Sequence, residues 1–191
     1  MKKILLLICI IGLFTPATLH AQDRANVFRH GKLDNGLTYY VRHTSMQPGK
    51  ADFYLVQNVG ALMEEDNQNG LAHFLEHMAF NGSESFKEGI PNFLKRRGVT
   101  RFNAQTGQDE TVYYMTAIPT NDTKLLDSCL LVMKDWSGFL LLKPDEIDKE
   151  RGVIREERRI RRNLGARLKE QSDPLVFNNS KYATRNVIGS E

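Results

Sequence analysis

The segment Leu71 to Phe80 reads LAHFLEHMAF, and its polar side chains stand out against an apolar background. His73, Glu76 and His77 form the pattern HxxEH. In a helix of 3.6 residues per turn, the two histidines lie one turn apart on the same face, and Glu76 lies beside them. Two imidazoles in this arrangement can share one metal ion. The surrounding apolar residues predict a helix anchored in a hydrophobic core, which gives the metal-binding side chains a rigid base.

HxxEH is also the inverted zincin signature, in which the two histidines bind zinc and the glutamate transfers a proton. A pair of histidines on a half-buried helix can instead be purely structural, and a short motif is a hypothesis until its context supports it. A catalytic zinc site usually has three protein ligands and keeps a fourth position for water. The motif therefore predicts that a carboxylate ligand comes from elsewhere in the chain.

Residues 1–21 have the features of a cleavable export signal. Two lysines precede an apolar run over residues 4–14, and the small residue Ala21 provides a cleavage site. The run is too short to span a bilayer as a stable helix. We expect a mature chain of residues 22–191, exported to the periplasm or cell surface of a bacterium, with no stable membrane span. Its one remaining cysteine, Cys129, is interpreted as a buried apolar residue.

The mature chain carries 24 basic and 23 acidic residues and is therefore nearly neutral. Overall charge gives no indication of a nucleic-acid partner. Seven arginines are concentrated between residues 151 and 167, interleaved with glutamates, which is typical of a solvated helix face. The alternative, a basic helix that binds nucleic acid or anionic lipid, predicts salt-dependent binding that survives charge reversal at the candidate metal ligands.

Strand and helix patterns alternate along the chain, whose mature length of about 170 residues suits one domain. Predicted strands cover 37–43, 51–59, 101–105 and 111–118, and predicted helices begin at 71 and cover 90–97, 121–142 and 144 to about 169. We expect the first two strands to pair as a hairpin, the turn TGQDE to join the last two, and Asn69 or a neighbouring Asp or Asn to cap the first helix. The predicted class is α+β, with a mostly antiparallel sheet packed on one face by helices.

The helix from Pro144 contains the sequence ERGVIREE, in which Glu150 and Glu157 are seven residues apart and share one face. Here the chain closely resembles the pitrilysin and insulinase family of zinc peptidases, also called the mitochondrial processing peptidase family. Four segments look like successive blocks of that family and together extend over nearly the whole mature chain. They are LDNGLTYYV, NVGALMEEDNQNGLAHFLEHMAFNGS, FNAQTGQDETVYY and SKYATRNVIG.

The resemblance implies a zinc-dependent metalloendopeptidase that hydrolyses extended peptides and binds one zinc ion per chain. It implies that Glu157 is the third ligand beside the two histidines, that Glu150 supports the site, and that Glu76 is the catalytic base. The 79 residues between His77 and Glu157 are slightly more than is usual in the family, so Glu156 remains the competing candidate.

Asn103 and Ala104 match the strand on which family members lay the substrate peptide. An exposed strand edge can take an extended peptide as an added strand through main-chain hydrogen bonds. The alternative is that FNAQT is simply a sheet strand with one polar face.

The resemblance implies a longer enzyme, because family members with an export signal look like chains of four related domains, arranged as two halves that close over the substrate. Residues 22–191 resemble only the first of these domains, so we expect a C-terminally truncated fragment. Its partners would be a peptide substrate and the missing domains, or a partner subunit. Alternatives are an inactive fragment and a non-catalytic, peptide-binding partner subunit, which the intact HxxEH motif and Glu157 disfavour.

Overall fold

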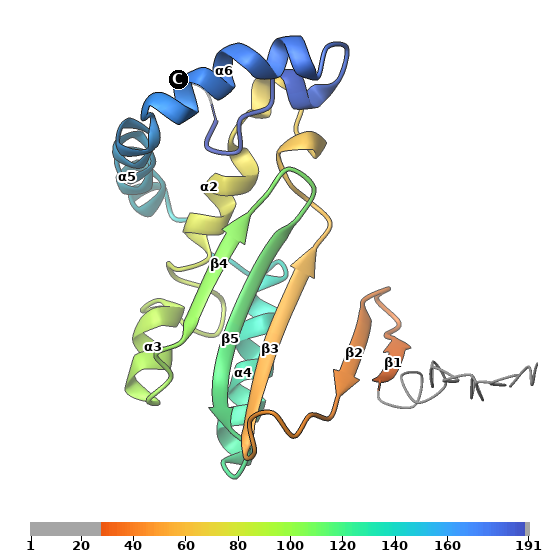
Figure 1. The fold of residues 1–191 in the computed structure, drawn as a ribbon. Coiled ribbons are helices and arrows are strands. Elements are labelled where there is room, and N and C mark those ends of the chain that lie inside the picture. The colour runs from red at the N-terminus through yellow and green to blue at the C-terminus, as the bar shows by residue number, and fades with distance from the viewer. Residues whose placement is uncertain (1–27, 190–191) are drawn as a thin grey trace, which may run out of the picture. The chain divides into compact units, whose positions relative to one another are not determined.

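The structure, a computed structural model, describes residues 28–189 (Figure 1). The predicted export signal at residues 1–21 lies outside the described residues. The chain divides into two compact units, Met1–Met46 and Gln47–Glu191, and each is described by itself. Within the described residues, no helix combines the length and the apolar character needed to cross a membrane.

The first unit contains a β-hairpin. Strand β1 (Phe28–Lys32) pairs antiparallel with β2 (Thr38–Arg42), and Gly36 allows the tight turn between them because its φ of 90° is left-handed. The predicted hairpin between residues 37–43 and 51–59 was therefore wrong. The first strand was missed because its sequence, FRHGK, has little apolar character and includes a glycine.

The second unit is built on a three-stranded antiparallel sheet. Its strands are β3 (Lys50–Gln57), β4 (Phe102–Thr106) and β5 (Thr111–Pro119), in the order β3-β5-β4. The predicted turn between the last two strands is present, and Gly107 N donates to Glu110 O at 2.7 Å. The α+β class with antiparallel sheet is confirmed. Because β4 pairs only with β5, one edge of β4 is free of strand partners within the described residues.

Helix α4 (Thr123–Trp136) packs along this sheet and supplies much of the core (Figure 1). Leu125, Cys129, Val132 and Trp136 recur at helical spacing and are all buried. Cys129 is a buried apolar residue as predicted, and burial raises the pKa of its thiol to about 11. The helix ends at Trp136 and not at residue 142, where the prediction placed its end.

Two shorter helices lie in the sequence between the edge strands β3 and β4. Helix α2 (Leu71–Met78) contains the HxxEH motif, and α3 (Ile90–Arg96) begins with Pro91 in its first turn. Gly98 lies just past the end of α3 with a φ of 76°, which a glycine adopts without steric cost. Helix α2 therefore begins at the predicted residue, and α3 begins and ends within one residue of its predicted positions.

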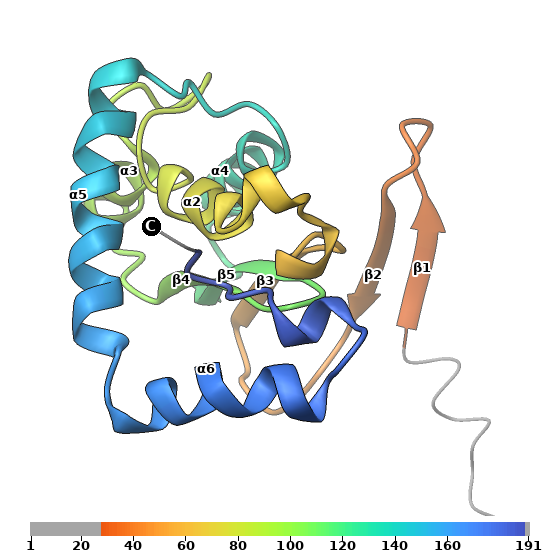
Figure 2. The same ribbon diagram turned by 90° about the horizontal axis from the view of Figure 1, so that it is seen from above.

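The single long helix predicted from residue 144 is in fact two helices, α5 (Pro144–Arg161) and α6 (Leu164–Val176). Asn163 has an extended backbone, and its side-chain oxygen accepts a hydrogen bond from Ala166 N at 3.1 Å, so it caps α6. Figure 2 shows that the two helices run in different directions. After α6, a short 3-10 turn (Lys181–Ala183) leads into residues 184–189, which return to the start of α2.

Candidate metal centre

Helix α2 begins at a glycine that has a left-handed backbone. Gly70 has a φ of 95°, and the predicted cap, Asn69, makes no capping hydrogen bond. Instead the buried carboxylate of Glu64 accepts from Gly70 N and Ala72 N, each at 2.8 Å. This carboxylate satisfies free N–H groups at the positive end of the helix dipole. The prediction failed because the capping group lies six residues upstream of Gly70, beyond the range of local cap patterns.

The helix is held on the core by its C-terminal end. Met78 and Ala79 are almost completely buried, and the indole Nε1 of Trp136 donates to Ala79 O at 3.0 Å. Two polar residues of the motif are also buried, with exposed fractions of 4% for His73 and 8% for Glu76, whereas His77 is half-buried. Buried polar groups of this kind are expected to have defined partners.

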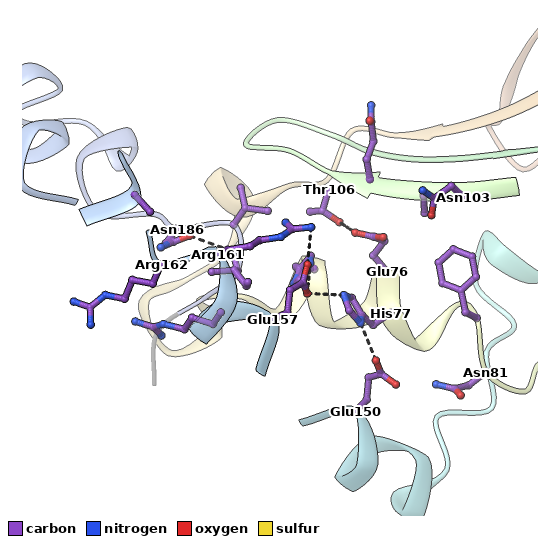
Figure 3. Close-up of a pocket in the computed structure, with 18 of the residues that line it drawn as sticks. Glu76, His77, Asn81, Asn103, Thr106, Glu150, Glu157, Arg161, Arg162 and Asn186 are labelled. Atoms are coloured by element: carbon purple, nitrogen blue, oxygen red, sulfur yellow. Dashed lines mark hydrogen bonds and ion pairs between the residues drawn. The ribbon is translucent and has the colours of Figure 1, made fainter. Parts of the chain in front are cut away.

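Helix α5 contacts α2, and its Glu157 faces His77 (Figure 3). Glu157 Oε2 lies 3.6 Å from His73 Nε2 and 3.1 Å from His77 Nε2. In a tetrahedral zinc site with bonds near 2.0 to 2.1 Å, neighbouring ligand atoms are about 3.4 Å apart. The three residues, which all offer atoms within 4.8 Å of one another, therefore fit a zinc ion.

A second observation agrees with this fit. Glu157 Oε2 is buried and has no hydrogen-bond partner in the described structure. A buried, unpartnered carboxylate oxygen is costly, and a bound cation removes that cost. The imidazole and carboxylate donors are also those that zinc prefers.

Glu150 and Glu157 contact opposite sides of the same imidazole ring. Glu150 Oε1 lies 2.7 Å from His77 Nδ1, so the ring donates its Nδ1 proton to Glu150 and keeps a lone pair on Nε2 for a metal. Glu156, the competing candidate, faces away: both of its oxygens contact the guanidinium of Arg159, at 2.6 and 2.8 Å. The structure thus brings Glu150 and Glu157 to the histidines and leaves Glu156 outside.

Glu76 lies beside this cluster with its own hydrogen-bond partner. Its Oε2 accepts from Thr106 Oγ1 at 2.8 Å, at the end of β4. Burial raises the pKa of Glu76, although the bond from Thr106 acts in the opposite direction. Burial, followed by the charge of His77, lowers the pKa of His73 to about 4, which favours the neutral imidazole that a metal requires.

Sequence reasoning missed two contributors to the site. Thr106 could be found only through the fold, because nothing in FNAQT indicates a contact with Glu76. Arg161 was interpreted as part of a solvated helix face, but its Nη2 lies 2.6 Å from Glu157 Oε1. The available signal was the spacing, since Arg161 follows Glu157 by one helical turn.

The candidate substrate residues lie in the same cavity as the metal cluster. Asn103 and Ala104 of β4 line a cavity of about 550 Å³ together with the two histidines and the glutamates of α2 and α5. The free edge of β4 borders this cavity, and its backbone groups are available to an extended peptide. Figure 3 shows the metal cluster between Asn103 on one side and Arg161 on the other.

Comparisons with known proteins identify the family of this chain. Residues 34–171 match the sequence profile described as Insulinase (Peptidase family M16). The chain is 36% identical over 166 residues to the Arabidopsis thaliana protein named Zinc protease PQQL-like, covering 85% of this chain and 17% of that protein. It is 35% identical over 165 residues to the probable zinc protease PqqL of Haemophilus influenzae, covering 84% of this chain and 18% of the relative.

The fold of the chain is also similar to that of a solved protease structure. The first half of the periplasmic protease PqqL from Escherichia coli superposes with a TM-score of 0.80 at 32% identity, covering 86% of this chain and 36% of that one. The chain spans less than a fifth of the length of the two curated relatives. The profile match extends over most of the chain and includes α2 and α5. The chain therefore belongs to the insulinase family of peptidases, family M16.

Proposed function

We propose that this chain forms the zinc-binding domain of a metalloendopeptidase that hydrolyses peptide bonds in extended peptides. The observation that carries the proposal is the buried Glu157 Oε2, which faces the Nε2 atoms of His73 and His77 and has no hydrogen-bond partner among residues 28–189. Family membership supports it, because the relatives are named zinc proteases.

In the proposed mechanism, His73, His77 and Glu157 hold one zinc ion. When bound, zinc supplies Lewis-acid chemistry that lowers the pKa of a water molecule and polarises the scissile carbonyl. Glu76 accepts the proton of the attacking water and passes it to the leaving amine. Thr106 orients the carboxylate of Glu76, and Glu150 fixes the ring of His77.

The proposed substrate site is the free edge of β4. A peptide that adds to this edge pairs its backbone with the strand that contains Asn103 and Ala104. Main-chain pairing of this kind favours extended substrates and is tolerant of sequence. It also fixes the scissile bond relative to Glu76, because Thr106 at the end of the same strand contacts Glu76.

We further propose that the complete enzyme acts in the periplasm and contains segments beyond this chain. The resemblance to a periplasmic protease of Escherichia coli and the expected export signal support the location. The greater length of the relatives supports additional domains, or a partner subunit, that complete the substrate site.

The test is cleavage of an internally quenched peptide by the zinc-loaded chain, with products identified by mass spectrometry so that slow turnover is measured. Glu76→Gln should lower the rate at least about 100-fold and keep the zinc, because it removes only the proton acceptor. Glu88→Gln is the matched control, since Glu88 is exposed and pairs with Arg96 outside the cavity. Unchanged cleavage by Glu76→Gln would contradict the mechanism. Zinc binding without any cleavage would favour the two alternatives, an inactive fragment or a non-catalytic, peptide-binding subunit.

A further inference from the structure

The two ends of the cavity differ in charge. At one end, near Asn103, the lining residues Phe80 and Asn81 are uncharged. At the other end, the last turn of α5 and the residue after it contribute three arginines to the lining: Arg158, Arg161 and Arg162. Figure 3 shows Arg161 and Arg162 on the opposite side of the metal cluster from Asn81 and Asn103.

The positive charge at this end is only partly compensated. Arg162 contacts Glu170 through two nitrogens, at 3.2 and 3.3 Å. Arg158 Nη1 donates to a neutral group, the backbone oxygen of Gly189, at 3.0 Å. Arg161 contacts Glu157, whose other oxygen faces the two histidines. Three guanidinium groups thus share Glu170 and a carboxylate that is also directed at the metal position.

The guanidinium groups also retain donors for a ligand. Each has five N–H groups, and the side chains of Arg161 and Arg162 are 68% and 55% exposed. Carboxylates are the natural partners of such groups, because a guanidinium can bind both carboxylate oxygens at once. A neutral or basic side chain gains no comparable interaction.

The position of the arginines matches a peptide on β4. Thr106, at the end of β4, contacts Glu76, and Arg161 contacts Glu157 next to it. In an extended peptide, every second side chain points to the same face. A residue one or two positions from the scissile bond, on the Thr106 side, would therefore point towards Arg161 and Arg162.

We propose that the arginine end of the cavity, formed by Arg158, Arg161 and Arg162, is a subsite for an acidic side chain of the peptide. The inference rests on the proposed function, since it assigns a substrate class to the same site. The chain should therefore prefer peptides with Asp or Glu close to one side of the scissile bond.

The experiment measures equilibrium binding of end-blocked fluorescent peptides to the zinc-loaded chain by anisotropy. A Glu76→Gln background keeps the peptides intact, and the peptides differ only in carrying Glu, Gln or Lys at one scanned position. At the responsive position, the Glu peptide should bind about five- to tenfold more tightly than the Gln peptide, and the Lys peptide more weakly than both. The difference should shrink as salt is added.

Variants of α5 locate the effect. Arg162→Gln should remove most of the preference, and Arg162→Glu should reverse it so that the Lys peptide binds better than the Glu peptide. Arg159→Glu introduces the same charge change three residues away, but Arg159 pairs with Glu156 outside the cavity and should leave the preference intact. A folding defect would weaken binding of all peptides and would not invert their order.

Equal binding of the Glu and Gln peptides, or no binding of any peptide, would overturn the subsite. The subsite would also be overturned if the Arg159 and Arg162 variants lost the preference for the Glu peptide to the same extent. If only peptides with a free C-terminal carboxylate bind more tightly, the site binds a chain end and the side-chain assignment is wrong. The proposed function is tested separately, by measuring the zinc content of the chain with Glu76 intact and its cleavage of the Gln peptide. If this chain cleaves peptides but shows no preference for acidic side chains, the subsite alone is rejected.

Discussion

The two oxygens of Glu157 have different surroundings. Oε2 faces the Nε2 atoms of His73 and His77, whereas Oε1 lies 2.6 Å from Arg161 Nη2. An arginine that holds one oxygen fixes the orientation of the carboxylate and leaves the other oxygen free to bind a metal. Groups that orient metal ligands in this way commonly change metal affinity by 10- to 100-fold when they are removed.

Arg161→Met should therefore weaken zinc binding about tenfold, which is the lower end of that range because the arginine is largely exposed. The dissociation constant can be measured by competition with a fluorescent chelator. Arg159→Met is the control, because Arg159 pairs with Glu156 on the exposed side of α5. Equal affinities of the wild type and Arg161→Met would show that Arg161 does not orient Glu157.

The lowered pKa of His73 predicts how the metal-free protein responds to acid. Its pKa falls from 6.5 to about 4 on folding, so the unfolded chain binds a proton at a pH where the folded chain does not. The contribution of neutral His73 to the free energy of unfolding is therefore fully present above about pH 6.5 and is lost as the pH falls towards 4. The raised pKa of Glu76 acts in the opposite direction, since its contribution is lost as the pH rises above the ordinary glutamate value.

Urea unfolding of the metal-free chain at several pH values between 7 and 4 measures this response. His73→Leu should lose less stability across this range than the wild type, because it removes the group that protonates on unfolding. His43→Leu, at an exposed position, is the control. If the free energies of unfolding of His73→Leu and of the wild type fell by the same amount between pH 7 and 4, the lowered pKa of His73 would be contradicted.

At the scale of the element, α2 depends on a close backbone contact at its start. A Cβ atom added to Gly70 would lie 2.6 Å from the Cα of Gly189, and the φ of 95° at Gly70 is unfavourable for other residues. Gly70→Ala should therefore lower the free energy of unfolding by about 1 to 3 kcal/mol. It should also weaken zinc binding, because the start of α2 would shift.

Gly152→Ala provides the matched comparison within α5. An added Cβ there meets no atom within 4 Å, and alanine favours a helix over glycine by about 0.5 to 1 kcal/mol. This variant should be as stable as the wild type or more stable. Denaturant unfolding of both variants tests the contrast, and an equal effect of the two substitutions would argue against the contact between Gly70 and Gly189.

Elements with a strong local pattern were predicted well from the sequence. Helices α2 and α3 and the hairpin of β4 and β5 follow from apolar spacing and turn residues. The partner of β2 was predicted wrongly because pairing depends on β1, whose sequence carries a weak strand signal. The break between α5 and α6 was missed because its signal is one capping residue, Asn163, among good helix formers.

At the scale of the whole molecule, the candidate metal centre joins segments that are far apart in the sequence. The motif on α2 is local, so His73, Glu76 and His77 could be identified from five consecutive residues. Glu150 and Glu157 were identified by family resemblance, and spacing alone left Glu156 open. Thr106 and Arg161 depend on how β4, α2 and α5 pack, which no local pattern encodes.

The most direct test is the zinc content of the purified chain and of two neighbouring variants, measured by native mass spectrometry. Glu157 lies between the two histidines, whereas Glu156 pairs with Arg159 on the exposed side of the same helix. We predict one zinc ion per chain in the wild type and in Glu156→Gln, and its loss in Glu157→Gln. Zinc retained by Glu157→Gln at the wild-type level, zinc lost from Glu156→Gln, or no zinc in the wild type would contradict the proposed metal centre.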